Sequence, residues 1–273
     1  MRSRELTDPT DLLKLARSVA VDAAALVRER GRAQVRVEAT KSSPVDVVTE
    51  TDQESERFIR RRLLRARPDD GFVGEEGAER ATRSGVTWVV DPIDGTVNFL
   101  YGLPHHAVSV AARVGEEVAA GVVVDVGSGE CFTATAGGGA FVDRVRLRVR
   151  MDVPMEERLV LTGFSYRSDV RRLQGRAVAR MLPRVRDIRR LGAGAIDLCM
   201  LAAGRADAYV EEGLRPWDIA AGGLVAREAG ARVETRLGAG GDGCLVAAPE
   251  AGFAAFSALV QECGFLGDTP AAG

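Results

Sequence analysis

The stretch Trp88-Val-Val-Asp-Pro-Ile-Asp-Gly-Thr-Val-Asn-Phe99 places two carboxylates, Asp91 and Asp94, directly after an apolar strand. The proline between them fixes one backbone dihedral, and the glycine after them permits close backbone approach or an unusual conformation. Both carboxylates and the carbonyl oxygen of Ile93 could then converge on Mg²⁺, which prefers oxygen ligands in octahedral geometry. The alternative is a plain strand-ending turn, in which Asp and Gly are common. Taken alone, this stretch leaves both interpretations open.

Further acidic residues stand at the ends of predicted strands or the starts of predicted helices. Glu75 follows the short apolar strand Phe72-Val73, where adjacent glutamates usually form a solvated turn. Asp52 stands at the start of a helix predicted over about 51–67, and Asp218 opens an apolar helix further on. Both aspartates have a simpler explanation as helix caps. Capping is the favoured interpretation of Asp218 taken by itself.

The order of the predicted elements divides the chain into two halves. Helices over 8–30 and 51–67 precede a run of short β-branched strands, and after about residue 150 strands and helices alternate. The strands are predicted near 35–39, 72–73, 87–90, 107–114, 118–126, 130–136, 140–142, 159–162, 186–191, 208–210 and 244–248, and the later helices near 170–182, 194–203, 217–229 and 251–263. This order predicts a largely antiparallel sheet in residues 1–150 and an α/β half in residues 151–273, packed together.

Composition excludes several classes of protein. Of 273 residues, 46% are apolar and 28% charged, as in ordinary globular proteins. No uncharged apolar run approaches the ~18 residues that span a bilayer, and the N-terminus does not resemble a signal-peptide core, so no membrane partner and a cytoplasmic location are expected. The 37 basic and 39 acidic residues give a net charge of −2, which argues against a dedicated polyanion binder.

The remaining metal-ligand and nucleophile types suggest no chemistry of their own. The four cysteines are far apart and form no CxxC pair, so buried reduced thiols are expected. His105 and His106 are the two histidines of the chain. Neighbouring residues on a strand point to opposite faces, so these two are expected to be structural or peripheral rather than joint ligands. Trp88 and Trp217 are expected to be packing residues.

Five blocks decide between the alternatives when they are taken together. They are Lys41-Ser-Ser-Pro-Val-Asp46, Val48-Thr-Glu-Thr-Asp52, Gly74-Glu-Glu76, Asp91-Pro-Ile-Asp-Gly-Thr-Val-Asn-Phe99 and Trp217-Asp-Ile-Ala-Ala-Gly222. Over nearly the whole chain this set resembles the inositol monophosphatase family of Mg²⁺-dependent, lithium-sensitive phosphatases, and Phe99–Pro104 and Thr162–Phe164 are closest to its bacterial branch. The resemblance implies an α/β fold of the α+β sugar-phosphatase type, a layered αβαβα sandwich, and a homodimer.

The resemblance also assigns metal ligands position by position. Glu75, Asp91 and the carbonyl of Ile93 would hold one Mg²⁺ ion. Asp91, Asp94 and Asp218 would hold a second, and Glu75 would also reach a third, more hydrated ion. Crowded carboxylates of this kind repel one another unless divalent cations neutralise them. Two to three Mg²⁺ ions are therefore the expected cofactors.

Catalytic and substrate-binding roles follow in the same way. Asp52 and Thr96, with Glu75, would orient and deprotonate the water that attacks phosphorus. The implied substrate contacts are Asp94, Gly95, Thr96, Gly194, Glu211 and Asp218, with Glu211 contacting substrate hydroxyls. Lys41 lies in the family's mobile loop near the metals, and a solvated loop cation is its alternative. No covalent nucleophile is required, so direct water attack without a phosphoenzyme is expected.

The substrate is the least determined part of the prediction. A small polyol phosphate, above all myo-inositol monophosphate, is favoured by Glu211 and the bacterial-type motifs. The loop that contains Ala193 and Gly194 departs from the usual family pattern, which bears on specificity. Histidinol phosphate is the alternative substrate. An RNA- or transcription-complex-binding factor with vestigial phosphatase activity is the alternative of a different class.

Overall fold

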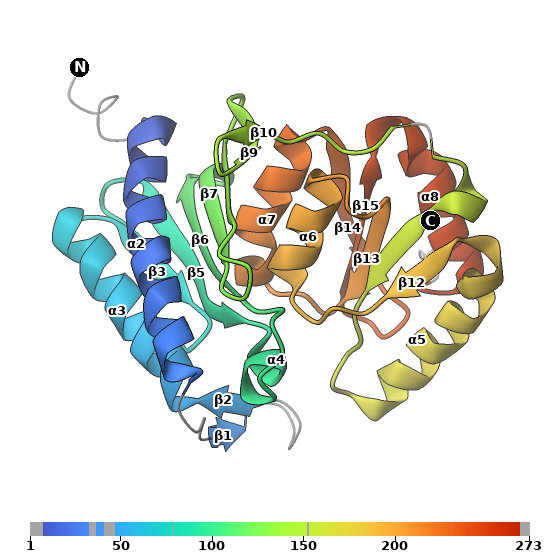
Figure 1. Ribbon diagram of the computed structural model, residues 1–273, viewed down its shortest axis with the longest axis horizontal. Coiled ribbons are helices and arrows are strands. Elements are labelled where there is room, and N and C mark those ends of the chain that lie inside the picture. The colour runs from blue at the N-terminus through green and yellow to red at the C-terminus, as the bar shows by residue number, and fades with distance from the viewer. Residues whose placement is uncertain (1–7, 33–36, 41–46, 78, 152, 268–273) are drawn as a thin grey trace, which may run out of the picture.

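The computed structural model describes residues 8–32, 37–40, 47–77, 79–151 and 153–267. Its main elements stack in layers: a helix pair, a sheet, a second helix pair, a second sheet and a third helix pair (Figure 1). This order confirms the predicted layered αβαβα sandwich. Within the described ranges, no helix is long and apolar enough to cross a membrane.

The first layer consists of two helices with clear start signals. α2 (Pro9–Arg30) begins after the N-cap Asp8, whose carboxylate accepts a hydrogen bond from the backbone of the first turn, and it ends at Gly31. α3 (Glu50–Ala66) begins after Thr49, which forms a capping box with the first turn. The apolar faces of both helices pack against one side of the first sheet.

The first sheet has the strand order β10-β9-β8-β7-β6-β5-β3-β4. Its strands are β3 (Gly71–Gly74), β4 (Glu79–Arg80), β5 (Val86–Asp94), β6 (Ala107–Val114), β7 (Glu117–Asp125), β8 (Cys131–Thr135), β9 (Gly139–Val142) and β10 (Val145–Arg146). Only β3 and β5 run parallel, so the sheet is mainly antiparallel, as predicted. A short helix, α4 (Thr96–Leu100), follows β5, and β1 (Val37–Thr40) pairs with β2 (Val47–Thr49) in a separate ribbon.

The middle layer contains α6 (Gly194–Ala202) and α7 (Pro216–Glu228). α7 packs against β6 and β7 of the first sheet and against β14 of the second. Small residues permit this close approach: a Cβ at Gly121 of β7 would lie only 2.9 Å from the Cα of Ala221. The first turns of both helices consequently lie beside the end of β5.

The second sheet has the strand order β12-β11-β13-β15-β14 and is mixed. Its strands are β11 (Leu159–Thr162), β12 (Asp187–Arg189), β13 (Ala208–Glu212), β14 (Ala231–Leu237) and β15 (Gly243–Pro249). The last layer, α5 (Ser168–Met181) and α8 (Phe253–Cys263), covers its outer face around a third apolar cluster.

Two details of the sequence prediction are corrected. His105 and His106 precede β6 instead of lying on it, so the strand argument for separating them is wrong. His106 has a structural role: its ring packs edge-on against Phe99 with centroids 5.3 Å apart, and its Nδ1 lies 3.0 Å from the Leu103 carbonyl. The other correction concerns omitted elements: the prediction lacked α4 and the strands β2, β4, β10 and β14, of which β14, an edge strand, is the longest. All four cysteines are buried and free, as expected.

Candidate active site

The end of β5 directs two aspartates toward the same side of its sheet. Asp91 lies opposite Ser109 of β6, whereas Asp94 lies opposite Ala107, so β5 contains one extra residue between them. In a regular strand, side chains three positions apart point to opposite faces, and this bulge removes that opposition. Pro92, which has no N–H to donate to the ladder, lies inside the bulge.

Gly95 ends the strand in a conformation that suits only glycine. Its φ of 90° is left-handed, and a Cβ would lie 2.8 Å from the His105 carbonyl oxygen. The chain can therefore turn sharply and begin α4 with Thr96. The Thr96 hydroxyl lies 3.1 Å from both the Ile93 carbonyl oxygen and Oδ1 of Asp52, either of which can accept a hydrogen bond from it.

Asp52 combines a cap with a link to this turn. Its Oδ2 accepts hydrogen bonds from the Thr49 backbone N–H, at 2.9 Å, and from the Thr49 hydroxyl. Its Oδ1 faces Thr96 from the other side. Burial raises the pKa of Asp52 to about 6, against the opposing effect of the Thr49 hydrogen bonds. A carboxyl group with this pKa can accept or hold a proton near neutral pH.

The N-termini of α6 and α7 fix two further carboxylates. The backbone N–H groups of Gly194 and Ala195 donate to the two oxygens of Asp94, at 3.1 and 2.7 Å. The backbone N–H of Arg215 donates to Oδ2 of Asp218 at 2.6 Å, so Asp218 does close the N-terminus of α7. These otherwise unpaired N–H groups and the helix dipoles favour negative charge at both positions.

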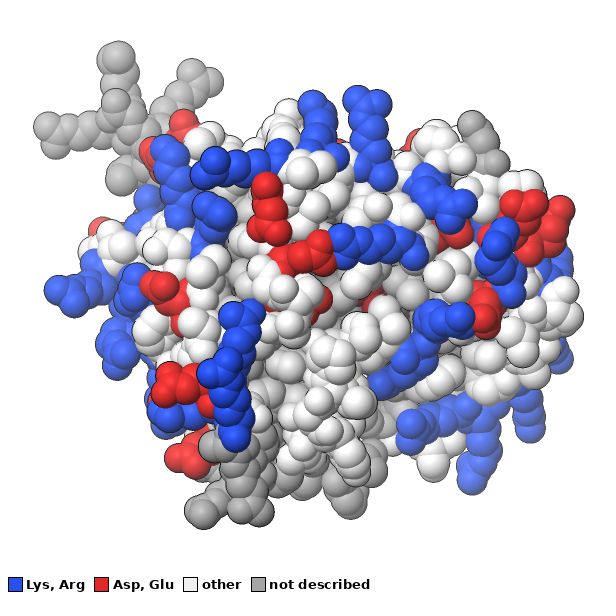
Figure 2. Space-filling model, viewed as in Figure 1, with Lys and Arg blue, Asp and Glu red and all other residues white. Residues whose placement is uncertain are grey.

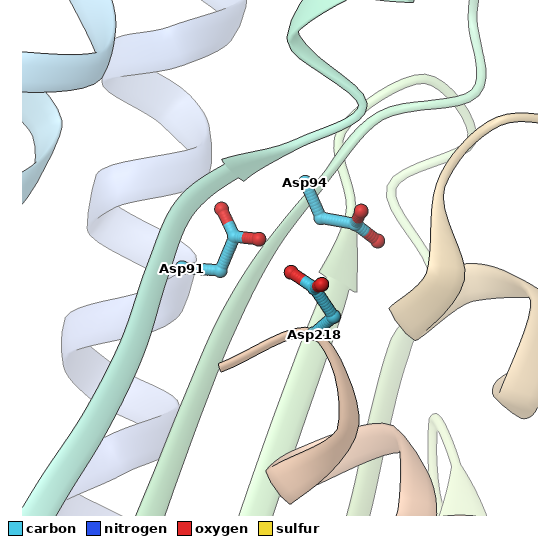
Figure 3. Close-up of side chains that lie close together, drawn as sticks. All are labelled: Asp91, Asp94 and Asp218. Carbon is cyan, nitrogen blue, oxygen red and sulfur yellow. The ribbon is translucent and has the colours of Figure 1, made fainter. Parts of the chain in front are cut away.

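Asp91, Asp94 and Asp218, here called the aspartate triad, converge on one point. One oxygen from each carboxylate can be chosen so that all three lie within 4.8 Å of one another. Figure 3 shows the three side chains projecting toward a common space, two from the end of β5 and one from the start of α7. Three buried or half-buried carboxylates whose oxygens approach one another this closely fit a hard divalent cation such as Mg²⁺.

The electrostatics of the triad support this fit. Burial raises the pKa of Asp91, and the charges of Glu75, Asp94 and Asp218 raise it further. Burial, followed by the charge of Asp218, raises the pKa of Asp94, and burial raises the pKa of Asp218 to about 6. Without a bound cation the negative charges of the triad repel one another, and a bound cation would reduce this repulsion.

A cleft of about 410 Å³ extends from the triad toward the second sheet. It is lined by Glu75, Asp91, Ile93, Asp94, Gly95, Thr96, Phe164, Ser165, Tyr166, Arg167, Arg190, Gly192, Gly194, Glu211, Glu212, Gly213, Leu214, Arg215, Trp217, Asp218 and Asp242. All the site residues predicted from sequence line this cleft except Asp52, which faces Thr96, and Lys41, which lies outside the described residues. Their assigned roles stay predictions.

Sequence reasoning missed several residues of the cleft. Arg167, Arg190 and Arg215 line it, but in a chain so rich in arginine no single arginine carried a signal. Trp217, expected only to pack, packs against the core and also lines the cleft. Asn98 links two segments that are far apart in sequence, because its Nδ2 donates hydrogen bonds to the carbonyl groups of His105 and Leu191 at 2.7 and 2.8 Å. Its place in the motif, two residues after Thr96, was the signal that could have identified it.

Comparison with known proteins agrees with this geometry. The model of the inositol monophosphatase family matches residues 8–263. An inositol-1-monophosphatase of Mycobacterium bovis is 44% identical over 272 residues, covering 92% of this chain and 93% of the relative. A protein of Pasteurella multocida named Nus factor SuhB is 41% identical over 199 residues, covering 72% and 74%.

A solved structure gives the same result for the fold. The structure of Mycobacterium tuberculosis SuhB superposes with a TM-score of 0.81 at 41% identity, covering 95% of this chain and 99% of that one. Sequence and fold thus both match over nearly the whole chain. The chain belongs to the inositol monophosphatase family.

Proposed function

We propose that this protein is a Mg²⁺-dependent phosphomonoesterase that hydrolyses a small polyol phosphate, with myo-inositol monophosphate as the first candidate. The observation that carries the proposal is the convergence of the aspartate triad at one end of a cleft, next to the Thr96 hydroxyl and Asp52. Relatives named inositol-1-monophosphatase support the substrate choice. The family match supports phosphatase chemistry in general.

The proposed site residues have two roles, which are to bind metal ions and to activate the attacking water. The triad, Glu75 and the Ile93 carbonyl would hold two to three Mg²⁺ ions. When bound, Mg²⁺ would lower the pKa of a bound water and stabilise charge on the attacking and leaving oxygens. Asp52, held by Thr49, would orient the Thr96 hydroxyl and take up a proton from the water. Direct attack needs no covalent phosphoenzyme.

The phosphate would lie at the triad, and the leaving group would extend along the cleft toward the second sheet. The backbone N–H groups of Gly95 and Thr96 would donate to phosphate oxygens. Glu211, toward the second sheet, would accept hydrogen bonds from hydroxyl groups of the polyol, with Gly194 beside it. The proposal includes a homodimer and a reducing, cytoplasmic environment, which the four free cysteines favour.

Histidinol phosphate is the alternative substrate for the same chemistry. Glu211 is a carboxylate, and a carboxylate accepts hydrogen bonds from an ammonium group as readily as from a hydroxyl group. The Glu211 carboxylate, which lines the cleft, therefore suits a cationic leaving group as well as a neutral polyol. Only a comparison of substrates separates the two.

A non-catalytic role is the second candidate function, and one surface favours it. Arg171, Arg172, Arg176 and Arg180 lie exposed on α5, and among the described residues no ion pair is found for any of them. Figure 2 shows basic side chains gathered at the lower right, over α5, whose one acidic residue, Asp169, pairs with Arg167. Such a face fits an RNA backbone. Some relatives carry the name Nus factor in place of an enzyme name.

The first experiment measures phosphate release with and without Mg²⁺ on four substrates: inositol 1-phosphate, histidinol phosphate, fructose 1,6-bisphosphate and adenosine 3′,5′-bisphosphate. We expect Mg²⁺-dependent turnover, a preference for inositol 1-phosphate, and inhibition by Li⁺. Asp94→Asn should reduce turnover by at least about a hundredfold, because it removes a ligand charge. RNA binding, measured in parallel, serves as the second readout.

Arg172→Ala/Arg176→Ala is the matched variant for the second candidate, since it alters α5 and leaves the cleft intact. We expect it to turn over substrate normally. A preference for histidinol phosphate would replace the polyol assignment but keep the phosphatase. No turnover of any substrate, together with RNA binding that survives Asp94→Asn and is lost in the arginine variant, would replace the enzyme with the binding role.

A further inference from the structure

Tyr209 and Glu211 form a side-chain pair on β13, and Glu211 lines the cleft. They are two residues apart on one strand, so their side chains lie on the same face of the sheet. Tyr209 is fully buried, and its hydroxyl donates to Oε2 of Glu211 at 2.7 Å. A buried phenol requires such a partner, and among the described residues this is the hydrogen bond found for its hydroxyl.

The surrounding chain leaves room for this pair. A Cβ at Gly163 would overlap the Glu211 carboxylate, and a Cβ at Gly194 would lie 3.2 Å from the Tyr209 hydroxyl. Two glycines on neighbouring elements therefore allow the phenol and the carboxylate to meet. Glu211 and Gly194 line the cleft, but Tyr209 does not, so any effect of Tyr209 on a ligand must pass through Glu211.

Without this contact, neither the orientation nor the ionised state of the Glu211 carboxylate would be fixed. A buried carboxylate has several hydrogen-bonding sites on two oxygens and needs donors to stay ionised. Burial raises the pKa of Glu211, whereas the Tyr209 hydroxyl and the charge of Arg190 lower it. The hydroxyl group thus both holds the carboxylate in place and favours its charged, accepting form.

We propose that Tyr209 is a positioning residue: its hydroxyl occupies Oε2 of Glu211 and leaves Oε1 to accept a hydrogen bond from the leaving group. This inference rests on the proposed function and deepens it, because it assigns selection of a hydroxyl-bearing leaving group to a residue outside the cleft. The role is confined to recognition of the leaving group. The phosphate and its attack by water lie at the triad, on the other side of the cleft.

The test compares two substrates that share the phosphate but differ in the leaving group. Inositol 1-phosphate offers hydroxyl donors to Glu211, and p-nitrophenyl phosphate offers none. Tyr209→Phe removes one oxygen atom from the buried ring and should raise KM for inositol 1-phosphate about fivefold, the value of one hydrogen bond of about 1 kcal/mol. Both kinetic constants for p-nitrophenyl phosphate should stay within about twofold, because no hydrogen bond to Glu211 is lost.

Two further variants complete the design. Glu211→Gln should raise KM for inositol 1-phosphate as well, and adding Tyr209→Phe to it should have little further effect, because both changes act through one interaction. Tyr101→Phe is the matched control: Tyr101 is 76% exposed and does not line the cleft, so neither substrate should be affected. A thermal melt of each variant checks that it is folded.

Equal changes with both substrates, or none with inositol 1-phosphate, would overturn the positioning role while leaving the phosphatase in place. The same holds for additive effects in the double variant, because these would show that Tyr209 does not act through Glu211. If the wild-type protein shows no Mg²⁺-dependent turnover of either substrate, the proposed function fails, and the inference fails with it.

Discussion

At the scale of single residues, Asp197 is a buried carboxylate outside the triad whose ionisation affects the stability of the protein. It lies inside α6 with 0% of its surface exposed, and among the described residues neither of its oxygens has a hydrogen-bond partner. Burial raises the pKa of Asp197 well above its ordinary value, and the charges of Glu211 and Asp94 raise it further. The folded protein therefore keeps this group protonated where the unfolded chain would ionise it.

Asp197→Asn should stabilise the protein, and the gain should grow with pH. Well below the unfolded-state pKa of about 3.9 both states bind the proton, so the aspartate causes little pH-dependent loss of stability there. As the pH rises above this value, the unfolded chain ionises first and unfolding becomes more favourable, until the pH passes the raised pKa of the folded state. Asparagine does not titrate, so we expect a gain of about 1–3 kcal/mol in the free energy of unfolding at pH 8 and less at pH 5.

Urea unfolding at the two pH values measures this difference. Asp22→Asn is the control, because Asp22 is half-exposed and its Oδ2 lies 3.0 Å from Nη2 of Arg62. A surface ion pair of this kind contributes little to the free energy of unfolding. Its effect should be below about 1 kcal/mol at both pH values. A loss of stability in Asp197→Asn at pH 8 would mean that the charged carboxylate has a stabilising partner after all.

Two site residues show why sequence reasoning left alternatives open at this scale. Asp52 and Asp218 were each weighed as a cap or as a functional group. Each is in fact a cap that also faces either the turn that contains Thr96 or the cleft. A pattern at one helix start cannot reveal the second contact, which comes from a distant segment. Asp197 did carry a signal, because it is a single acid within an otherwise apolar helix.

At the scale of elements, the turn from β5 into α4 leaves little room for one added methyl group. Gly95→Ala must adopt a left-handed φ of 90° and also bring its Cβ within 2.8 Å of the His105 carbonyl. The backbone conformation alone costs about 1–2 kcal/mol. The contact adds to this cost or moves the turn, and with it Thr96 and Asp94.

Gly85→Ala separates these two effects. Gly85 has a φ of 87°, nearly equal to that of Gly95, but no atom lies within 4 Å of the added Cβ. Denaturant unfolding should give about 1–2 kcal/mol for Gly85→Ala and more for Gly95→Ala, and phosphate release should fall only in the latter. Equal losses of stability with full activity in both variants would show that the turn tolerates the methyl group.

Elements with strong local signals were predicted well, and those defined by pairing were not. α2 was recognised from Asp8 and Gly31, which mark its ends, and the structure places it at Pro9–Arg30. β14 was missed because it is an edge strand with charged residues at Arg232, Glu234 and Arg236, and its hydrogen bonds to β15 give no local signal. The bulge in β5 depends likewise on pairing with β6.

At the scale of the whole molecule, the candidate site joins parts of the chain that are far apart in sequence. Asp91 and Asp94 come from the first sheet, whereas Asp218 comes from α7 in the middle layer. α7 belongs to the second half by sequence but packs on the first sheet. We propose that residues 1–150 and 151–273 are halves of one cooperative unit whose contact assembles the site, so that folding and cation binding are coupled.

This coupling predicts that Mg²⁺ raises the melting temperature. The unfolded chain has no assembled triad, so Mg²⁺ binds the folded protein preferentially. At a hundred times its Kd, Mg²⁺ would add about 2.7 kcal/mol to the free energy of unfolding, which raises the melting temperature by several degrees for a chain of this size.

Asp218→Asn keeps a side-chain oxygen to accept the hydrogen bond from Arg215 but removes one charge of the triad. Its melting temperature should respond much less to Mg²⁺, whereas Asp169→Asn, which alters an exposed acid on α5, should respond like the wild type. Calorimetric scans over a Mg²⁺ titration distinguish these cases, and an equal response in all three proteins would place the cation away from the triad, where neither half needs the other to bind it.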